Sequence, residues 1–167
     1  TRNMAETKNR IASIASRVER LPAFLRSRAL SAIFGRVIPF AGTAGVCFEE
    51  LSAGRVVVSL DNRRRVQNHI KGVHATAMAL IVETATGFVV GYSLPDDKLP
   101  LLKSLKIDDR KRSRGAMRAV ATLSEEQRAR LLAEEKGDVA VPVTVTDESG
   151  AEPIECEIVW AWVKKRR

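Results

Sequence analysis

The sequence is poor in the residues that build most recognisable catalytic and metal sites. It holds only two histidines, His69 and His74, which are five residues apart, and two cysteines, Cys47 and Cys156, without metal-ligand spacing. It contains no Gly-x-Ser-x-Gly nucleophile elbow, no P-loop and no Gly-x-Gly-x-x-Gly fingerprint. We therefore expect no metal site, and we interpret the two thiols as small core residues.

Aromatic residues are also scarce, at 5% of the chain, whereas the net charge is +8. The positive charge favours an anionic partner: nucleic acid, an anionic membrane surface or a phosphate-bearing cofactor. Simple solubility is the alternative. Nucleic acid is disfavoured because single strands bind by stacking on aromatic side chains. The first ten residues, TRNMAETKNR, lack the apolar stretch of a secretory signal, and lone cysteines suit a reducing compartment, so we expect a cytoplasmic protein.

The length of 167 residues suits one domain, and the patterning predicts the α+β class. We divide the chain into an N-terminal helical extension, 1–40, and a main domain, 41–167. Short helices are predicted at 9–20 and 24–34, and Gly42 and Gly45 mark a turn. The remaining elements are a hairpin of 46–51 and 55–60, strands at 104–114, 116–123, 141–145 and 154–163, and a helix that Ser124 and Gln127 cap and Gly137 ends.

The segment between Gly72 and Pro95 is apolar nearly all round, and Glu83 is its only formally charged residue. Such a segment predicts a helix that is buried on most sides. We expect Gly87 to end this helix and 88–94 to leave it as a strand. A membrane span is disfavoured because Glu83 falls at its middle and threonines and glycines interrupt it, so we expect no membrane partner.

A carboxylate on a buried helix is costly unless it is hydrogen-bonded or functional, so both a structural and a catalytic Glu83 remain open. The turn from Gly72 to Thr76 leads into the helix, whose first amides are unpaired donors that can polarise a carbonyl. Thr76 and Glu83 are seven residues apart, about 10 Å along the helix axis. Two antiparallel copies of the helix across a two-fold axis would bring one chain's amides to the other chain's Glu83. If these groups cooperate, the sequence favours a dimer with shared sites.

The pattern Asn68-x-x-x-Gly72-x-His74, with a carboxylate nine residues after the histidine, resembles hotdog-fold acyl-CoA thioesterases. The phenylacetyl-CoA thioesterase branch has a comparable pattern, and within this phenylacetyl-CoA thioesterase-like group the chain most resembles a subgroup with Asn-His before the glycine and Glu on the helix. The resemblance extends from about Gly45 to Val163 and implies an antiparallel sheet wrapped around a long central helix, here with extra N-terminal helices. It also implies hydrolysis of an acyl-CoA or acyl-carrier thioester by a homodimer or a dimer of dimers. Coenzyme A enters as part of the substrate, and no separate cofactor is implied.

Carried over residue by residue, the resemblance makes Glu83 the group that positions or deprotonates the attacking water, or that attacks directly. The Ala75 N–H would polarise the thioester carbonyl. Asn68, from the protomer opposite Glu83, would order the water or thioester, and His74 would brace the turn or touch the substrate. The structural alternatives are a cap for His74 and a turn residue for Asn68.

One departure concerns the two glycines that follow the histidine in the family, which are Ala75 and Thr76 here. Their amides remain, but their side chains narrow the approach, although Thr76 offers a hydroxyl donor. The alternative to an enzyme is therefore a non-catalytic acyl-CoA-binding protein, acting as a sensor or scaffold. An acyl dehydratase is disfavoured because it would need a His and Asp pair.

The basic surface has a specific candidate partner in the phosphates of coenzyme A. Two clusters are candidates for binding them: Arg63, Arg64 and Arg65, just before the motif, and Lys111, Arg112 and Arg114 in the second half. For each of these residues, a solvated loop is the alternative.

Overall fold

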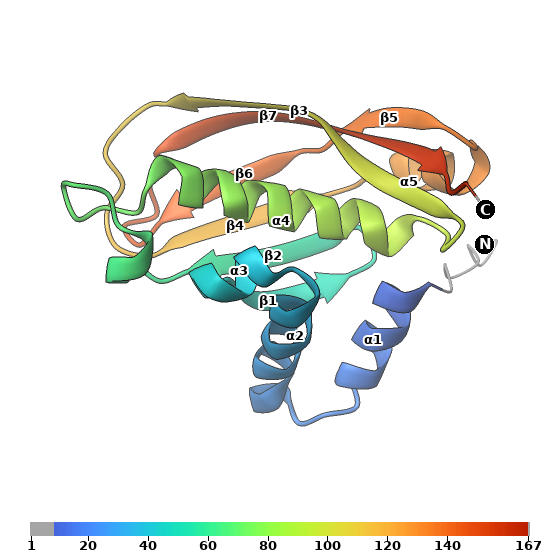
Figure 1. Cartoon of the computed structure of the whole chain (residues 1–167), viewed down its shortest axis with the longest axis horizontal. Helices are drawn as coiled ribbons and strands as arrows, with labels where there is room; N and C mark the ends of the chain where they lie inside the picture. The colour runs from blue at the N-terminus through green and yellow to red at the C-terminus, as the bar shows by residue number, and fades with distance from the viewer. Residues whose placement is uncertain (1–8, 167) are drawn as a thin grey trace.

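Antiparallel strands curve around one long helix in the computed structural model, which describes residues 9–166 (Figure 1). The helices are α1 (Arg10–Val18), α2 (Ala23–Val37), α3 (Pro39–Ala44), η1 (Arg64–Val66), α4 (Ala75–Ser93) and α5 (Glu125–Ala133). The strands are β1 (Cys47–Ser52), β2 (Arg55–Leu60), β3 (Lys98–Asp109), β4 (Met117–Thr122), β5 (Gly137–Ala140), β6 (Val143–Asp147) and β7 (Ile154–Lys164). The predicted α+β class and the hairpin of the first two strands are confirmed.

The strands form two sheets, ordered β1-β2-β4-β6 and β3-β7-β5, with every pair antiparallel. The sheets meet at Val141–Pro142, between β5 and β6. The Val141 N–H donates to the Ile158 carbonyl of β7 at 3.0 Å, whereas the Pro142 carbonyl accepts from the Thr122 N–H at 3.0 Å. Proline has no N–H to continue a ladder, so Pro142 divides the range predicted as one strand and moves the chain to the other sheet.

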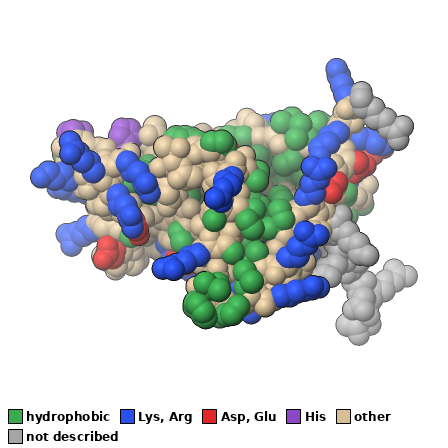
Figure 2. All heavy atoms as spheres, turned by 60° about the horizontal axis from the view of Figure 1, so that its bottom comes forward, with side chains coloured by type: hydrophobic (Ala, Val, Ile, Leu, Met, Phe, Trp, Pro, Cys, Tyr) green, Lys and Arg blue, Asp and Glu red, His purple; other side chains and the backbone are tan. Residues whose placement is uncertain are grey.

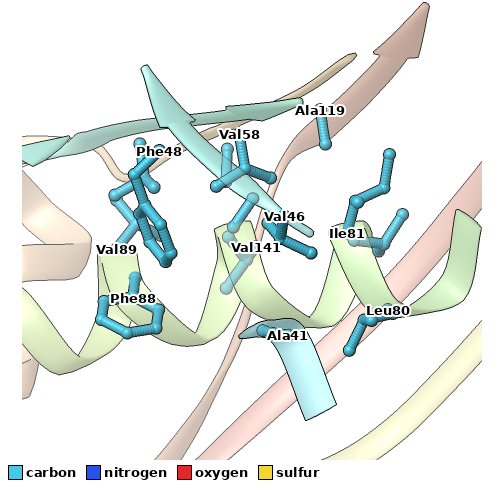
Figure 3. Close-up of a cluster of buried hydrophobic side chains, with 14 of the residues drawn as sticks. Ala41, Val46, Phe48, Val58, Leu80, Ile81, Phe88, Val89, Ala119 and Val141 are labelled. Carbon is cyan, nitrogen blue, oxygen red and sulfur yellow. The ribbon is translucent and has the colours of Figure 1, made fainter. Parts of the chain in front are cut away.

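The core lies where α4 packs against the curved sheets. Side chains of α4, among them Ile81 and Val89, meet Val58 of β2 and Ala119 of β4 (Figure 3). By length and composition α4 could cross a membrane, but 67% of its most apolar stretch is buried inside the structure, as expected of a core helix. An antiparallel sheet wrapped around a buried central helix is the hotdog fold, as the resemblance implies.

Several predictions about element ends are wrong, including the one for Gly137, which begins β5 and does not end α5. Gly87 does not end the central helix, and residues 88–93 continue it instead of forming a strand. A Cβ at Gly87 would lie 2.8 Å from the Trp160 ring, so the glycine makes room for an indole and is not a terminator. Of the two glycines predicted to mark a turn, Gly42 lies within the helix α3, which Pro39 begins, whereas Gly45 ends that helix with a left-handed φ of 84° and leads into β1, as predicted.

The N-terminal helices share the core of the rest of the chain. The Asn9 side chain caps α1 by accepting from the Ala12 N–H at 2.8 Å, and its amide donates to three carbonyls at the end of α4, those of Gly91, Tyr92 and Leu94. These bonds fasten the start of α1 to the end of the central helix. The division of the chain at residue 40 stays a prediction.

Candidate active site

The motif loop is held by Asn68. Its side-chain Oδ1 accepts from the backbone N–H groups of Ile70 at 3.1 Å and Gly72 at 3.0 Å. The backbone N–H of Asn68 donates to the Gly72 carbonyl at 2.9 Å. Lys71 has a left-handed φ of 62° within this closed turn. The oxygen of Asn68 is thus used structurally, while its Nδ2 donates to no residue among 9–166 and remains available to a ligand.

His74 caps the central helix. Its Nδ1 accepts from the Thr76 N–H at 3.1 Å and lies 2.8 Å from the Thr76 hydroxyl. Because a backbone N–H can only donate, Nδ1 is the acceptor in this cap. This arrangement matches the structural alternative for His74, a helix cap, and the Thr76 hydroxyl lies within hydrogen-bond distance of the imidazole ring. The Ala75 N–H is the first helical amide, has no acceptor in the described part of the chain and belongs to an exposed residue.

Glu83 lies eight residues after Ala75 on α4, about 12 Å along the helix axis. Its carboxylate is half-buried and makes no hydrogen bond or ion pair with any residue that the structure describes. Burial raises its pKa above the ordinary value of 4.5. The pairing to Arg or capping by Ser and Thr that a structural role requires is therefore not found in residues 9–166.

Glu83 opens into a pocket of about 210 Å³ whose other described lining residues are uncharged. Phe34 of α2 and Trp160 of β7 belong to this lining. Trp160 is fixed by its Nε1–H, which donates to the buried Thr86 hydroxyl at 2.9 Å. Sequence reasoning found Glu83 but missed the pocket, because its walls come from segments far apart in the chain and no local signal links them.

The candidate residues occupy three separate hollows of one chain. Asn68 and Ala75 line one of about 390 Å³, His74 and Thr76 line another of about 230 Å³, and Glu83 lines the pocket already described. One chain therefore does not bring Glu83 to the amide of Ala75. This separation agrees with the axial distance, and the sharing of sites between protomers stays a prediction.

The second basic cluster lies beside the motif. Lys111 and Arg112 line the same hollow as Asn68 and Ala75. The Arg112 guanidinium donates to the Ile70 carbonyl at 3.1 Å, which fixes it at the edge of the motif loop. Cations at this position can pair with an anionic group of a ligand that enters the hollow.

The first basic cluster is largely engaged within the chain. Arg63 forms an ion pair with Asp61 at 2.9 Å, and the Arg65 Nε donates to the Ala44 carbonyl at 3.1 Å. Arg64 and Arg114 are exposed, and their side chains form no ion pair with a described residue. These two remain candidates, whereas Arg63 and Arg65 already have local roles.

Other chemistry finds little support among the described residues. No group of three or more His, Cys, Asp or Glu side chains within 9–166 is placed to hold a metal ion. Burial raises the pKa of the Cys156 thiol to about 11, helped by the charges of Asp109 and Glu155. This thiol keeps its proton at neutral pH and is a poor nucleophile.

Solved structures of other proteins share this fold, and three of them illustrate it. A Pseudomonas aeruginosa protein described as a probable thioesterase is 24% identical with a TM-score of 0.74, over 87% of this chain and 97% of its own. A Haemophilus influenzae thioesterase is 10% identical (TM-score 0.62, covering 75% and 82%), and one from Staphylococcus aureus is 14% identical (TM-score 0.63, covering 76% and 99%). At these identities the likeness establishes the hotdog fold and no more.

The family is shown by its sequence model. The domain of unknown function DUF4442 matches residues 26–163, and the chain belongs to this family. No curated protein sequence matches significantly.

Proposed function

We propose that the protein hydrolyses acyl thioesters and that the Glu83 carboxylate is the general base for the attacking water. The observation that carries the proposal is the half-buried carboxylate of Glu83, which has no partner in the described chain. It lies on the central helix, and the protein shares its fold with thioesterases. Burial favours this role because a raised pKa makes the carboxylate a stronger base while leaving it ionised above that pKa.

The chemistry needs two groups on opposite sides of one carbonyl. Glu83 takes a proton as the water oxygen bonds to the thioester carbon, and the Ala75 N–H of the second protomer stabilises the resulting oxyanion. When the carbonyl re-forms, the carbon–sulfur bond breaks and the protonated Glu83 returns its proton to the departing thiolate. The products are a carboxylic acid and a thiol.

The strand β3 offers a surface for a second copy. This strand lies at the edge of its sheet and exposes Leu99, Leu101 and Leu102 by 42, 44 and 42%. An exposed apolar edge strand invites pairing with another strand. Two copies paired there across a two-fold axis would carry antiparallel α4 helices, which is the arrangement that the shared site requires.

The thiol portion is assigned to coenzyme A because of the cations beside the motif. Lys111 and Arg112 of the protomer that supplies Ala75 would bind its phosphates. An acyl-carrier protein is the other thiol that fits the same chemistry.

A non-catalytic acyl-CoA-binding protein is the second candidate function. Its supporting observation is the helix entrance, where Ala75 and Thr76 stand in place of two glycines and the Thr76 hydroxyl is engaged by His74. In that case the carboxylate would meet a bound thioester without completing the reaction.

A panel of acyl-CoAs assayed for thiol release tests the proposal. We expect turnover by the wild type and a loss of at least about 100-fold in Glu83→Gln, which keeps the shape and removes the base. Glu19→Gln, at an exposed carboxylate without an ion pair in the described chain, is the matched control and should keep full activity. Turnover that survives Glu83→Gln would remove Glu83 from the mechanism, and binding without turnover in the wild type would favour the second candidate.

A further inference from the structure

The pocket beside Glu83 is walled by the N-terminal helices. Ile11 of α1 and Phe34, Val37 and Ile38 of α2 and its end line it opposite the central helix. Figure 1 shows α1 and α2 projecting from one side of the body, and Figure 2 shows hydrophobic side chains gathered on this face, with Lys and Arg around them. The extra helices therefore contribute directly to the surroundings of the candidate catalytic carboxylate.

The floor of the pocket is helix backbone. Gly87 and Gly91 of α4 line it, and a Cβ at Gly91 would lie 3.0 Å from the Ile11 Cδ1. Ile11 thus rests almost directly on the central helix and forms part of the pocket wall. Phe34 packs edge-on against Phe88 with ring centroids 4.6 Å apart, which fixes another wall. Asn9 ties α1 to the end of α4, so these contacts hold the walls of the pocket in place.

We infer, on the basis of the proposed thioester hydrolysis, that this pocket holds the acyl group and that the N-terminal helices limit its length. A carboxylate at one side and apolar walls elsewhere match an acyl group whose carbonyl lies at Glu83 and whose tail is apolar. A cavity of about 150 Å³ holds benzene. A pocket of about 210 Å³ therefore suits a single aromatic ring or a straight chain of about six carbons.

The occupancy is tested with thioethers, which cannot be hydrolysed. Binding of hexyl-CoA and dodecyl-CoA is measured by calorimetry for the wild type, Ile11→Ala and Ile14→Ala. Ile14 is the matched control, since it lies half-buried on the same helix and does not line this pocket. We expect the wild type to prefer hexyl-CoA by about tenfold or more, Ile11→Ala to reduce that preference at least about fivefold, and Ile14→Ala to keep it.

A second variant, which fills the pocket, separates a change in the pocket from a loss of folding. Val37→Phe adds bulk from an exposed position, and we expect it to weaken hexyl-CoA binding by about fivefold or more while circular dichroism stays unchanged. Wild-type binding of dodecyl-CoA that is as tight as that of hexyl-CoA or tighter, or equal effects of the two isoleucine variants, would overturn the inference. Thioether binding is measured without turnover, so it tests the acyl pocket separately from hydrolysis. If the protein binds hexyl-CoA selectively but hydrolyses no acyl-CoA, the proposed hydrolysis is rejected and the acyl pocket is retained.

Discussion

Two threonines of the central helix should respond oppositely to the same substitution. Thr84 and Thr86 are 1% and 0% exposed. The Thr86 hydroxyl accepts from the Trp160 indole at 2.9 Å and donates to the Val82 carbonyl at 2.7 Å, whereas the Thr84 hydroxyl has no hydrogen-bond partner in the described chain. Substitution by valine keeps the shape and the helix propensity nearly constant, so the hydroxyl is the main difference.

The magnitudes follow from what each change leaves behind. Thr86→Val buries the Trp160 N–H without an acceptor, which costs about 1–3 kcal/mol. Thr84→Val removes a buried hydroxyl that makes no bond, so it should be neutral or should stabilise by up to about 1 kcal/mol. For a chain of this size, these changes correspond to a fall of about 2–12 °C and a rise of up to about 4 °C in Tm.

Urea unfolding followed by tryptophan fluorescence and far-UV circular dichroism measures both variants. Trp160→Phe in the Thr86→Val background should recover part of the loss, because the unpaired donor is then absent. Equal destabilisation by the two valine variants would refute the assignment of these hydrogen bonds, and with it the account of how the pocket wall is held.

Three further predictions concern charge. Because burial raises the Glu83 pKa, the protonated side chain stabilises the folded state; this stabilisation is complete below about pH 4.5 and is lost as the pH rises through the raised pKa. Glu83→Gln should therefore be more stable than the wild type at neutral pH and lose that advantage in acid. A stability advantage that does not depend on pH would contradict burial of the carboxylate as its cause. Lys98 is 8% exposed and donates to three carbonyls at the end of α5. Lys98→Met should lower the free energy of unfolding in urea by about 2–4 kcal/mol, whereas Lys103→Met, at an exposed lysine, should lower it by less than about 1 kcal/mol. Equal losses would refute a capping role for Lys98 at the end of α5. Arg112→Ala should weaken hexyl-CoA binding by about fivefold in calorimetry. Arg63 already forms an ion pair, so Arg63→Ala should change this binding less than about twofold. The reverse order of effects would move the phosphate site to the first basic cluster.

Local signals in the sequence predicted local structure well. The capping box of Ser124 and Gln127 is present as predicted, because both of its hydrogen bonds lie within four residues. The isolation of Glu83 in an apolar helix also required only the neighbouring residues, and the structure places that carboxylate on the central helix without a described partner. The hotdog resemblance rested on the same short stretch.

The errors have a tertiary cause. Gly87 continues the helix because the ring of Trp160, from the last strand, fills the space that a side chain would need. The strand β3 begins at Lys98 rather than at 104, since an exposed edge lacks the alternation that marks a half-buried strand. The pocket beside Glu83 was invisible for the same reason, as Ile11 and Phe34 reach it only after the fold has formed.

The shared site can be tested by mixing two inactive variants. Glu83→Gln removes the base, and Ala75→Pro removes only the amide donor, at the first helical position, where proline is tolerated. The residue before it, His74, has a φ of −64° and a ψ of 142°, which suits a following proline.

Acyl-CoA hydrolysis after subunit exchange between these two variants is the most direct measurement of the central claim. Each variant alone should be inactive, and the mixture should recover up to about one quarter of the wild-type rate, because half of the dimers are mixed and each mixed dimer holds one intact site. A mixture that stays inactive while the wild type turns over would contradict a catalytic Glu83 that works across the protomer boundary.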